Sequence, residues 1–281
     1  MNNKKSPNRA PLVLPGGALD FSRPLVMSIV NCTNDSFYKE SRTPGGEAAC
    51  GRALEAAEAG ADIIDFGAES SRPGAAYVDE ETELARLIPA VKRFRKYSSL
   101  PVSVDTRKVN TARIALDEGA DIINDISCNP ALAVLAAKTG AALVVMHMKG
   151  EPKTMQEDPV YDDPVAEVQS FLKAAVQRAL DSGVPPQKII LDPGIGFGKK
   201  TADNIALLRG LDEIRFGDYP LLVGLSRKSF IGDITGRPVS ERLAGTLAAG
   251  AVALASGADI LRVHDSAETA DLIKIWRACA A

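Results

Sequence analysis

The chain has 281 residues, of which 46% are hydrophobic and 25% are charged, and its formal net charge at pH 7 is −3. Such a composition supports a sizeable globular core, and the slightly acidic balance gives no general electrostatic reason to bind nucleic acid or an anionic membrane. The longest uncharged apolar stretch, 243–258, is too short and too often interrupted for a membrane span. The basic first residues lack the apolar run of a signal peptide, and the four scattered cysteines suggest no disulfide scaffold, so we expect a cytoplasmic location.

A four-residue sequence, Gly-Ala-Asp-Ile, occurs three times, at 60–63, 119–122 and 257–260. Each copy follows an alanine-rich amphipathic stretch and leads into a short apolar run rich in β-branched residues. Glycine ends helices readily in a left-handed conformation, and buried β-branched runs are typical of parallel strands. The repeat therefore predicts the joint between a helix and the strand that follows it.

The rest of the chain fits the same alternation. The predicted strands lie at 25–30, 63–67, 101–105, 122–126, 142–147, 189–192, 221–226 and 260–264. The predicted helices lie at 46–59, 81–97, 109–118, 130–138, 164–182, 202–214, 240–256 and 266–279. This alternation predicts an α/β fold, a single (β/α)8 TIM barrel over 23–281 with a short N-terminal arm at 1–22. An open doubly wound sheet is the alternative, but no phosphate-binding glycine fingerprint follows Val30.

In a TIM barrel the reaction site lies at the carboxyl ends of the strands, and most polar residues within the apolar runs fall there. Each has an ordinary explanation, because an aspartate at a strand end often caps a helix and Asp-Pro-Gly is common in turns. His147 is equally well explained as a core histidine. The convergence of many polar groups on one rim nevertheless favours a ligand, because desolvating them would be costly without one. These groups are Asp105, Asn124, Asp192, Lys228, Arg262 and His264.

The chemistry of the rim falls into two groups. One offers hydrogen-bond acceptors and donors that suit a flat heterocycle rich in N–H groups and ring nitrogens. The other suits an anionic or metal-bound group, because the arginine fork binds two phosphate oxygens at once. The first group is Asp105, Asn124 and Asp192; the second is Asn31, Arg72, Arg262 and His264. Mg²⁺, held by one amide oxygen and by substrate phosphates, is consistent with this set.

Seven motifs follow one another at barrel spacing: ESSRPGA, VDTRK, IINDI, MHMKGEP, LDPGIGFGK, GLSRKSFIG and RVHD. Together they resemble the dihydropteroate synthase family, the folate-pathway enzymes that sulfonamides inhibit, from Leu25 to the last helix. The resemblance implies condensation of 6-hydroxymethyl-7,8-dihydropterin pyrophosphate with p-aminobenzoate to give 7,8-dihydropteroate and pyrophosphate. It also implies a requirement for Mg²⁺ and a homodimeric assembly.

The resemblance further implies roles for individual residues. The pterin would be held by Asp105, Asn124, Asp192 and Lys228, with Arg262 stacked on its face. The pyrophosphate and Mg²⁺ would be held by Asn31, Arg262 and His264, with Asn31 as the metal ligand. The p-aminobenzoate pocket would be formed by Phe197, Lys228 and Ser229. The residues in catalytic roles would be Asp35, Asp105, Lys228 and Arg262.

Two loops would close over this site. Their implied site residues are Asp35, Phe37, Ser71, Arg72 and Pro73. Both loops depart from the family pattern, because Asn34 stands where a proline is usual and Ala68 where a glycine is usual. The implied reaction needs no enzyme nucleophile, since a pterin-stabilised cation forms as pyrophosphate leaves and the arylamine then attacks.

Two other functions share part of this pattern. A corrinoid-type, pterin-dependent methyltransferase would have the same barrel and pterin-binding acids, but the SSRPG and SRKS motifs argue against it. A non-catalytic pterin-binding paralogue is a second alternative, and the phosphate-handling and loop residues argue against it.

Overall fold

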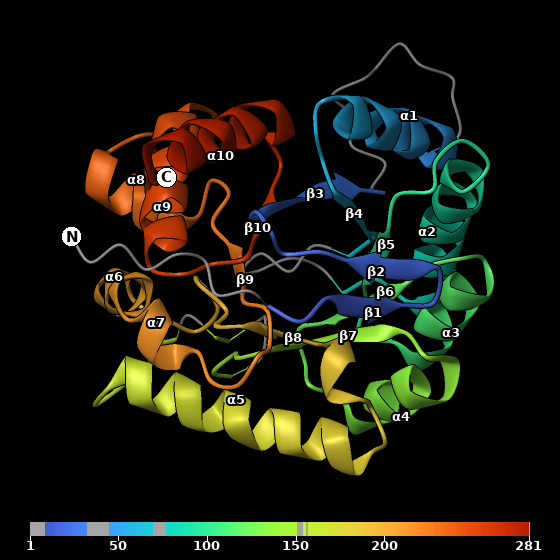
Figure 1. Ribbon diagram of the computed structural model, residues 1–281, viewed down its shortest axis with the longest axis horizontal. Helices are drawn as coiled ribbons and strands as arrows, with labels where there is room; N and C mark the ends of the chain where they lie inside the picture. Colours follow the sequence, from blue (N-terminus) through green and yellow to red (C-terminus); the bar gives the residue numbers. More distant parts are fainter. Residues whose placement is uncertain (1–8, 33–44, 70–76, 151–153, 156, 281) are drawn as a thin grey trace.

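The computed structural model describes residues 9–32, 45–69, 77–150, 154–155 and 157–280 of the chain. The barrel strands are β3 (Leu25–Asn31), β4 (Ile63–Gly67), β5 (Val102–Asp105), β6 (Ile122–Asp125), β7 (Ala142–Met146), β8 (Ile189–Asp192), β9 (Leu222–Gly224) and β10 (Ile260–Val263). The helices are α1 (Gly45–Glu58), α2 (Glu80–Phe94), α3 (Val109–Asp117), α4 (Pro130–Thr139), α5 (Pro164–Asp181), α6 (Thr201–Arg209), α7 (Leu211–Ile214), α8 (Ser229–Thr235), α9 (Leu243–Ala255) and α10 (Ser266–Ala280). Helices surround the strands (Figure 1).

The strands form one parallel sheet in the order β8-β7-β6-β5-β4-β3-β10-β9. Its two edges meet, because Leu191 of β8 forms a parallel bridge with Leu221, the residue before β9. The N–H of Leu191 also donates to the carbonyl of Pro220 at 2.9 Å. The sheet therefore closes into a barrel, and the predicted TIM-barrel fold is confirmed.

The helix predictions differ from the structure in three places. The predicted helix at 202–214 is divided at Gly210 into α6 and α7. A Cβ on Gly210 would lie 2.8 Å from the side chain of Val165, so the glycine allows α5 to approach closely here. The predicted helix at 240–256 begins only at Leu243, after a 3₁₀ turn at Val239–Glu241. Helix α8 was not predicted, because its seven residues are too few to show a helical period.

The three Gly-Ala-Asp-Ile copies form the predicted joints. Gly60, Gly119 and Gly257 end their helices in the left-handed region, with φ of 97°, 101° and 98°. Each glycine allows the chain to turn directly into the next barrel strand, β4, β6 or β10.

The aspartate of each copy caps the amino-terminal end of a neighbouring strand. The hydrogen bonds run from Val26 N to Asp62 at 2.9 Å, from Val102 N to Asp121 at 2.9 Å and from Leu221 N to Asp259 at 2.8 Å. Each carboxylate is also paired with arginine: Asp62 with Arg23, Asp121 with Arg95, and Asp259 with both Arg9 and Arg215. The same arrangement, an aspartate that accepts a strand N–H and pairs with arginine, therefore stabilises the amino-terminal rim at three places.

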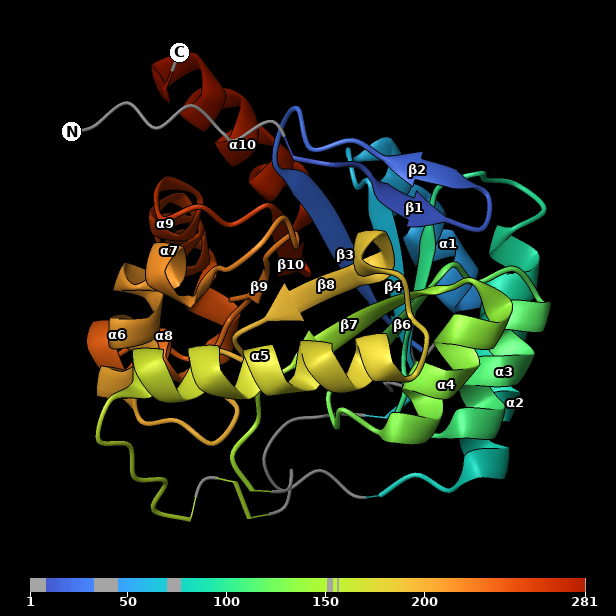
Figure 2. The same ribbon diagram turned by 60° about the horizontal axis from the view of Figure 1, so that its bottom comes forward.

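A hairpin closes this end of the barrel. Strands β1 (Leu12–Leu14) and β2 (Gly17–Leu19) pair antiparallel and lie across the barrel mouth (Figure 2). Leu12, Leu14 and Phe21 are buried against the first layer of inward-facing residues. That layer comprises Leu25, Met27, Ile63, Ile122, Ala142, Val144, Ile190, Leu222 and Ile260. The hairpin falls in the segment predicted as an arm, while the division of the chain at residues 22 and 23 stays a prediction.

Among the described helices, none combines the length and the apolar character needed to cross a bilayer. The larger apolar core lies between the outer faces of the strands and the surrounding helices, and it includes Phe66 and Phe94 in an edge-to-face contact. With the amino-terminal mouth filled and the outer faces covered, the open end for a ligand is the carboxyl-terminal rim.

Candidate active site

A buried charge cluster lies inside the barrel, below its carboxyl-terminal rim. Arg262 of β10 reaches across the interior and donates from Nε to Asp65 Oδ2 at 2.7 Å and from an Nη atom to Asp105 Oδ2 at 2.6 Å. Asn124 of β6 donates to the same Asp65 oxygen at 3.1 Å. Two predicted pterin residues, Asp105 and Asn124, are therefore joined to Arg262 through direct contacts or through Asp65.

In this cluster two carboxyl groups, those of Asp65 and Asp105, share the guanidinium of Arg262. Burial raises the pKa of Asp105 to about 7, against the opposing effect of Arg262. Burial alone would lower the pKa of Arg262, but the carboxylates of Asp65 and Asp105 raise it. Asp65 Oδ1 is buried and has no hydrogen-bond partner among the described residues. The arrangement therefore leaves acceptor capacity for a ligand with N–H donors.

A pocket of about 290 Å³ opens above this cluster. Five predicted site residues line it: Asn124, Asp192, Phe197, Lys228 and Arg262. The Nζ atom of Lys228 lies 4.1 Å from the centroid of the Phe197 ring, so the pocket joins a cation, an aromatic face and the buried carboxylate of Asp192. Burial raises the pKa of Asp192, which accepts a hydrogen bond from Gly194 N at 2.7 Å.

The turn that presents Lys228 is anchored from two sides. Its neighbour Arg227 adopts a left-handed conformation with φ of 55°, which is unusual for a residue with a side chain. The Arg227 guanidinium donates to both oxygens of Asp265, at 3.1 and 2.6 Å, and its N–H donates to Thr246 Oγ1 at 3.0 Å. These bonds from the β10 and α9 segments fix the backbone on which Lys228 stands.

Three further predicted residues lie at the same end of the barrel without lining this pocket. Asn31 ends β3 with its side chain exposed. His264 follows β10, and its Nδ1 lies 2.9 Å from Ser226 Oγ. Ser229 begins α8 and is exposed. Their predicted roles toward pyrophosphate, Mg²⁺ and p-aminobenzoate stay predictions.

The two predicted loops lie outside the described residues. This applies to five predicted site residues, Asp35, Phe37, Ser71, Arg72 and Pro73. The described residue before the second loop, Glu69, is held firmly, because Arg107 and Lys108 each donate to its carboxylate at 2.7 Å. Both cations follow Asp105 on the segment after β5, so the root of the loop is tied to the strand that carries a predicted pterin residue.

The donor set fits Mg²⁺ only together with a phosphorylated substrate. Within the described ranges, no group of three or more His, Cys, Asp or Glu side chains could hold a metal ion. The exposed Asn31 side chain offers one amide oxygen, and Mg²⁺ commonly takes its other ligands from water and substrate phosphates. The residues present therefore suit an ion that arrives with the pyrophosphate.

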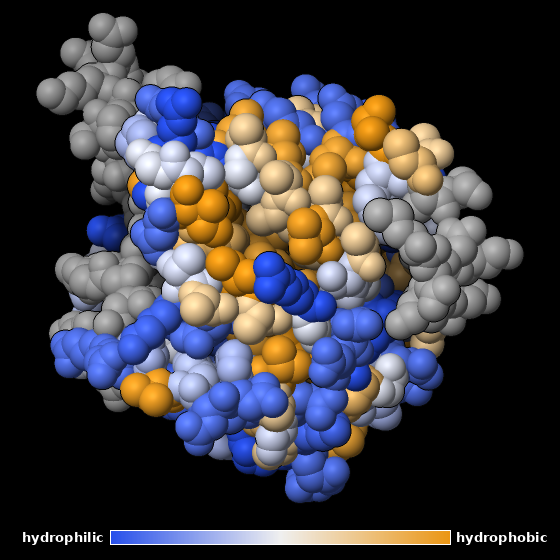
Figure 3. Space-filling model, turned by 90° about the vertical axis from the view of Figure 1, so that its left-hand side faces the viewer, coloured by the Kyte–Doolittle hydropathy of each residue, from blue (hydrophilic) through white to orange (hydrophobic). Residues whose placement is uncertain are grey.

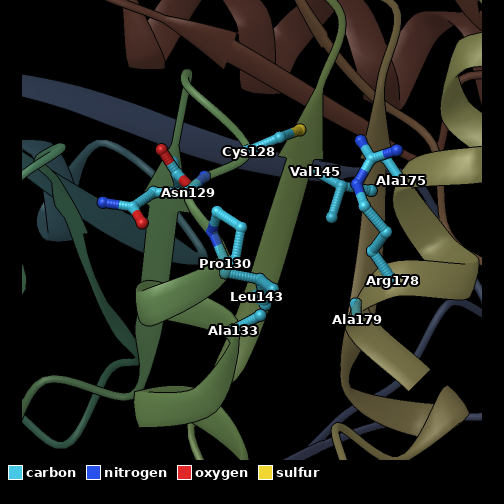
Figure 4. Close-up of a pocket in the computed structure, with 10 residues that line it drawn as sticks. Cys128, Asn129, Pro130, Ala133, Leu143, Val145, Ala175, Arg178 and Ala179 are labelled. Carbon is cyan, nitrogen blue, oxygen red and sulfur yellow. The ribbon is translucent and has the colours of Figure 1, made fainter. Parts of the chain in front are cut away.

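A second pocket, of about 300 Å³, lies on the outside of the barrel between α4 and α5 (Figure 4). Cys128, Arg178 and the outward-facing Leu143 and Val145 line it. None of the predicted site residues that the structure describes lines this pocket. Burial raises the pKa of the Cys128 thiol to about 12, which disfavours the thiolate that a nucleophilic role would need.

Asp65 is a site residue that the motifs do not predict, and His147 is one for which the sequence alone does not decide between a core and a site role. Asp65 is fully buried on β4, and its signal in the sequence is a lone carboxylate inside the apolar run Ile-Ile-Asp-Phe-Gly. His147 is a buried residue whose ring packs edge-on against Phe171 at 4.8 Å between centroids. The core-histidine interpretation is therefore the correct one for His147.

Comparisons with known proteins agree with this geometry. The profile of the family described as pterin binding enzyme matches residues 27–264. Dihydropteroate synthase of Escherichia coli K12 is 44% identical over 269 residues, which cover 95% of each chain. The structure of Xanthomonas albilineans dihydropteroate synthase with 4-aminobenzoic acid has a TM-score of 0.91 and 42% identity, covering 97% of this chain and 99% of that one. Burkholderia cenocepacia dihydropteroate synthase complexed with 7,8-dihydropteroate gives a TM-score of 0.88 at 42% identity, covering 96% of each chain. The chain therefore belongs to the dihydropteroate synthase family of pterin-binding enzymes.

Proposed function

We propose that the rim pocket condenses 6-hydroxymethyl-7,8-dihydropterin pyrophosphate with p-aminobenzoate to form 7,8-dihydropteroate and pyrophosphate. The observation that carries this proposal is the pocket itself, where the Lys228–Phe197 pair lies beside Arg262 and the buried Asp192 and Asn124. A two-substrate reaction needs a polar site for the heterocycle and an adjoining aromatic, cationic site for the carboxylated arylamine. The pocket combines both.

The buried acids would recognise the pterin. Asp192 and Asn124 line the pocket and offer acceptors to the N–H edge of the ring. Asp105 does not line it but bonds to Arg262, which does. Asp65 holds the Arg262 guanidinium in place from below, so its planar face is set before the substrate arrives. Preorganised groups of this kind lower the free energy of the transition state without moving during the reaction.

The proposed reaction separates charge: a cationic pterin forms as the anionic pyrophosphate leaves. The bond between the pterin methylene carbon and the pyrophosphate oxygen breaks, and its electron pair leaves with the pyrophosphate. The amine nitrogen of p-aminobenzoate then bonds to the methylene carbon and loses one proton. Asn31, Arg262 and His264 would hold the leaving group, and Mg²⁺, when bound there, would neutralise its growing negative charge. The carboxylate of Asp105 would stabilise the cationic pterin electrostatically, and Asp35 would do so from the first loop.

We also propose that the enzyme is a homodimer, formed through the outer face of α9. This helix contains no charged residue, and Ala248 and Val252 on its outer face are exposed. Ile234 of α8 and Val239, which precede α9 in the chain, are also exposed. Figure 3 shows hydrophobic side chains gathered on this side of the molecule. Contiguous exposed apolar patches commonly mark protein interfaces. Sedimentation velocity tests the proposal: Val252→Glu should convert the dimer to a monomer, and an unchanged sedimentation coefficient would rule out this face.

The four cysteines are all free, including the exposed Cys279, which is in keeping with the reducing conditions of the cytoplasm that we propose as the location.

One assay separates the candidate functions. Purified protein is incubated with Mg²⁺, the pterin pyrophosphate and labelled p-aminobenzoate, and labelled dihydropteroate is measured. We expect product formation that Asp105→Ala abolishes. Pterin binding without release of pyrophosphate would establish a non-catalytic paralogue instead. Methyl transfer from methyltetrahydrofolate to a corrinoid protein would establish the methyltransferase.

A further inference from the structure

We propose that Lys199 is a positioning residue for the second substrate: its amine fixes the turn between β8 and α6 and thereby sets the place of Phe197 in the pocket. This inference rests on the proposed function, because Phe197 matters here as part of the p-aminobenzoate site. Lys199 itself is 3% exposed and does not line the pocket.

The amine of Lys199 is surrounded by hydrogen-bond acceptors of the protein. Its Nζ atom lies 2.8 Å from the carbonyl oxygen of Gly194, 3.0 Å from that of Phe197 and 3.4 Å from that of His147. The Nδ1 atom of His147 lies at 2.9 Å. Two of these partners belong to the turn and two belong to the residue that follows β7. Lys199 therefore fastens the turn to the neighbouring strand.

The turn needs such a fastening because its backbone is intrinsically flexible. Gly194, Gly196 and Gly198 adopt left-handed conformations with φ of 65°, 82° and 60°. A Cβ on Gly194 would lie 1.9 Å from the carbonyl oxygen of His147, so the turn packs backbone against backbone. Glycine permits this approach but supplies no side chain to hold it. Lys199 supplies the bonds that the glycines cannot make.

The fastened carbonyl belongs to Phe197, whose ring faces the pocket. The Phe197 ring lies 4.1 Å below the Lys228 ammonium group, and Gly196 leaves room for that side chain, since a Cβ there would lie 3.1 Å from Lys228 Cδ. Movement of the turn would therefore shift the aromatic ring relative to the cation. Movement of the turn should displace Asp192 less, because Asp192 is the last residue of β8, which pairs with β7.

His147 is suited to act as the neutral partner. Two effects lower the pKa of His147 to about 3: burial is the larger, and the charge of the nearby Lys199 is the second. The ring is therefore uncharged near neutral pH. Burial also lowers the pKa of Lys199 to about 7, against the attraction of Asp192. A neutral amine keeps two N–H donors for the carbonyls of Gly194 and Phe197 and accepts from His147, so the fastening persists in both protonation states.

Lys199→Met tests the proposal, since it keeps the length of the side chain but removes the N–H donors. We expect KM for p-aminobenzoate to rise about tenfold or more, while KM for the pterin pyrophosphate changes by less than about threefold. Lys188→Met is the matched control. Lys188 also donates to a backbone carbonyl, that of Gly140, but it lies at the amino-terminal end of β8. The Lys188→Met variant should therefore have unchanged KM values for both substrates.

A double-mutant cycle with Phe197→Ala shows whether Lys199 acts through that ring. If it does, the effects of Lys199→Met and Phe197→Ala on KM for p-aminobenzoate are not additive. Additive effects, or an unchanged KM in a folded Lys199→Met enzyme, would overturn the inference. Activity of the unaltered enzyme tests the proposed function separately, so the two failures are distinguishable.

The His147 partner offers a second route if Lys199→Met does not fold. His147→Asn retains a side chain that can form hydrogen bonds, whereas His147→Leu does not. We expect His147→Leu to raise KM for p-aminobenzoate and His147→Asn to restore most of the difference. Equal KM values in the two variants would contradict the proposal, because a purely packing role would not depend on a hydrogen bond to Lys199.

Discussion

The two ends of the barrel both contain buried charges, but they use them differently. At the amino-terminal end, one Asp–Arg pairing occurs three times, and each aspartate also accepts a strand N–H. At the carboxyl-terminal end no pairing is repeated in this way among the described residues. There Arg262 serves two carboxylates at once, and Asp65 Oδ1 has no partner in the described part of the chain.

This difference separates stability from function. The Asp–Arg ion pairs at the amino-terminal end neutralise each other and stabilise the chain where it turns from helix to strand. Buried charged groups that lack a full set of partners raise the free energy of the folded protein unless a ligand supplies the missing partners. A repeated polar device therefore indicates architecture, whereas a unique and unsatisfied one indicates a binding site.

The strongest test of the comparison removes a charge from the carboxyl-terminal end. We expect Lys228→Ala to lower kcat/KM by about a thousandfold, because the pocket loses the ammonium group beside Phe197, and to change the free energy of unfolding by less than about 1 kcal/mol. Enzyme kinetics and urea denaturation measure the two effects. An exposed pair provides the control, since Arg113→Ala should change neither quantity. A Lys228→Ala enzyme of normal activity would contradict the assignment of the pocket.

Removal of divalent metal is expected to have the next largest effect. Chelation by EDTA should lower activity about a hundredfold, and added Mg²⁺ should restore it. The melting temperature should stay constant, because the donors proposed for the ion are an amide and the substrate rather than a carboxylate cage. Calorimetry with and without EDTA checks this, and a lower melting temperature would show that the ion also stabilises the fold.

At the amino-terminal end the expected effects are reversed. Asp121→Ala should destabilise the protein by about 3 kcal/mol, because it leaves Arg95 without its carboxylate and Val102 N without an acceptor. The kcat of the folded protein should be unchanged. Urea denaturation and steady-state kinetics measure both quantities. Loss of kcat in a fully folded variant would show that the two ends are not independent.

The smallest expected effect is a pH dependence of stability at Asp105. Burial raises its pKa to about 7, so the folded protein holds this proton more tightly than the unfolded chain does between about pH 4 and pH 7. The resulting stabilisation is fully present below about pH 4 and is lost as the pH rises through 7. From pH 5 to pH 8 the unaltered protein should therefore lose about 2.5 kcal/mol relative to Asp105→Asn, as measured by urea denaturation. A constant difference would show that the carboxyl is not desolvated.

Periodicity and repeats were enough to predict the eight barrel strands, because each strand is a short apolar run beside a turn signal. The hairpin was missed, although a Pro-Gly pair separates its two apolar runs, because strands of three residues are too short to alternate visibly. Motifs located Asn124, Asp192 and Lys228 in one pocket. They could not reveal the role of Asp65, because its partner Arg262 is 197 residues away.

The hairpin over the barrel mouth has a consequence for the order of folding. Arg9, next to the first strand, donates to Asp259, next to the last, across 250 residues of chain. Contacts of such long sequence separation form late, because the loop they close loses much conformational entropy. During synthesis the hairpin cannot pack on the complete barrel mouth, with Arg9 paired to Asp259, before β10 has been made. Leu12 and Leu14 precede every barrel strand in the chain, so the apolar layer that buries them is complete only after Ile260 of β10 has been made.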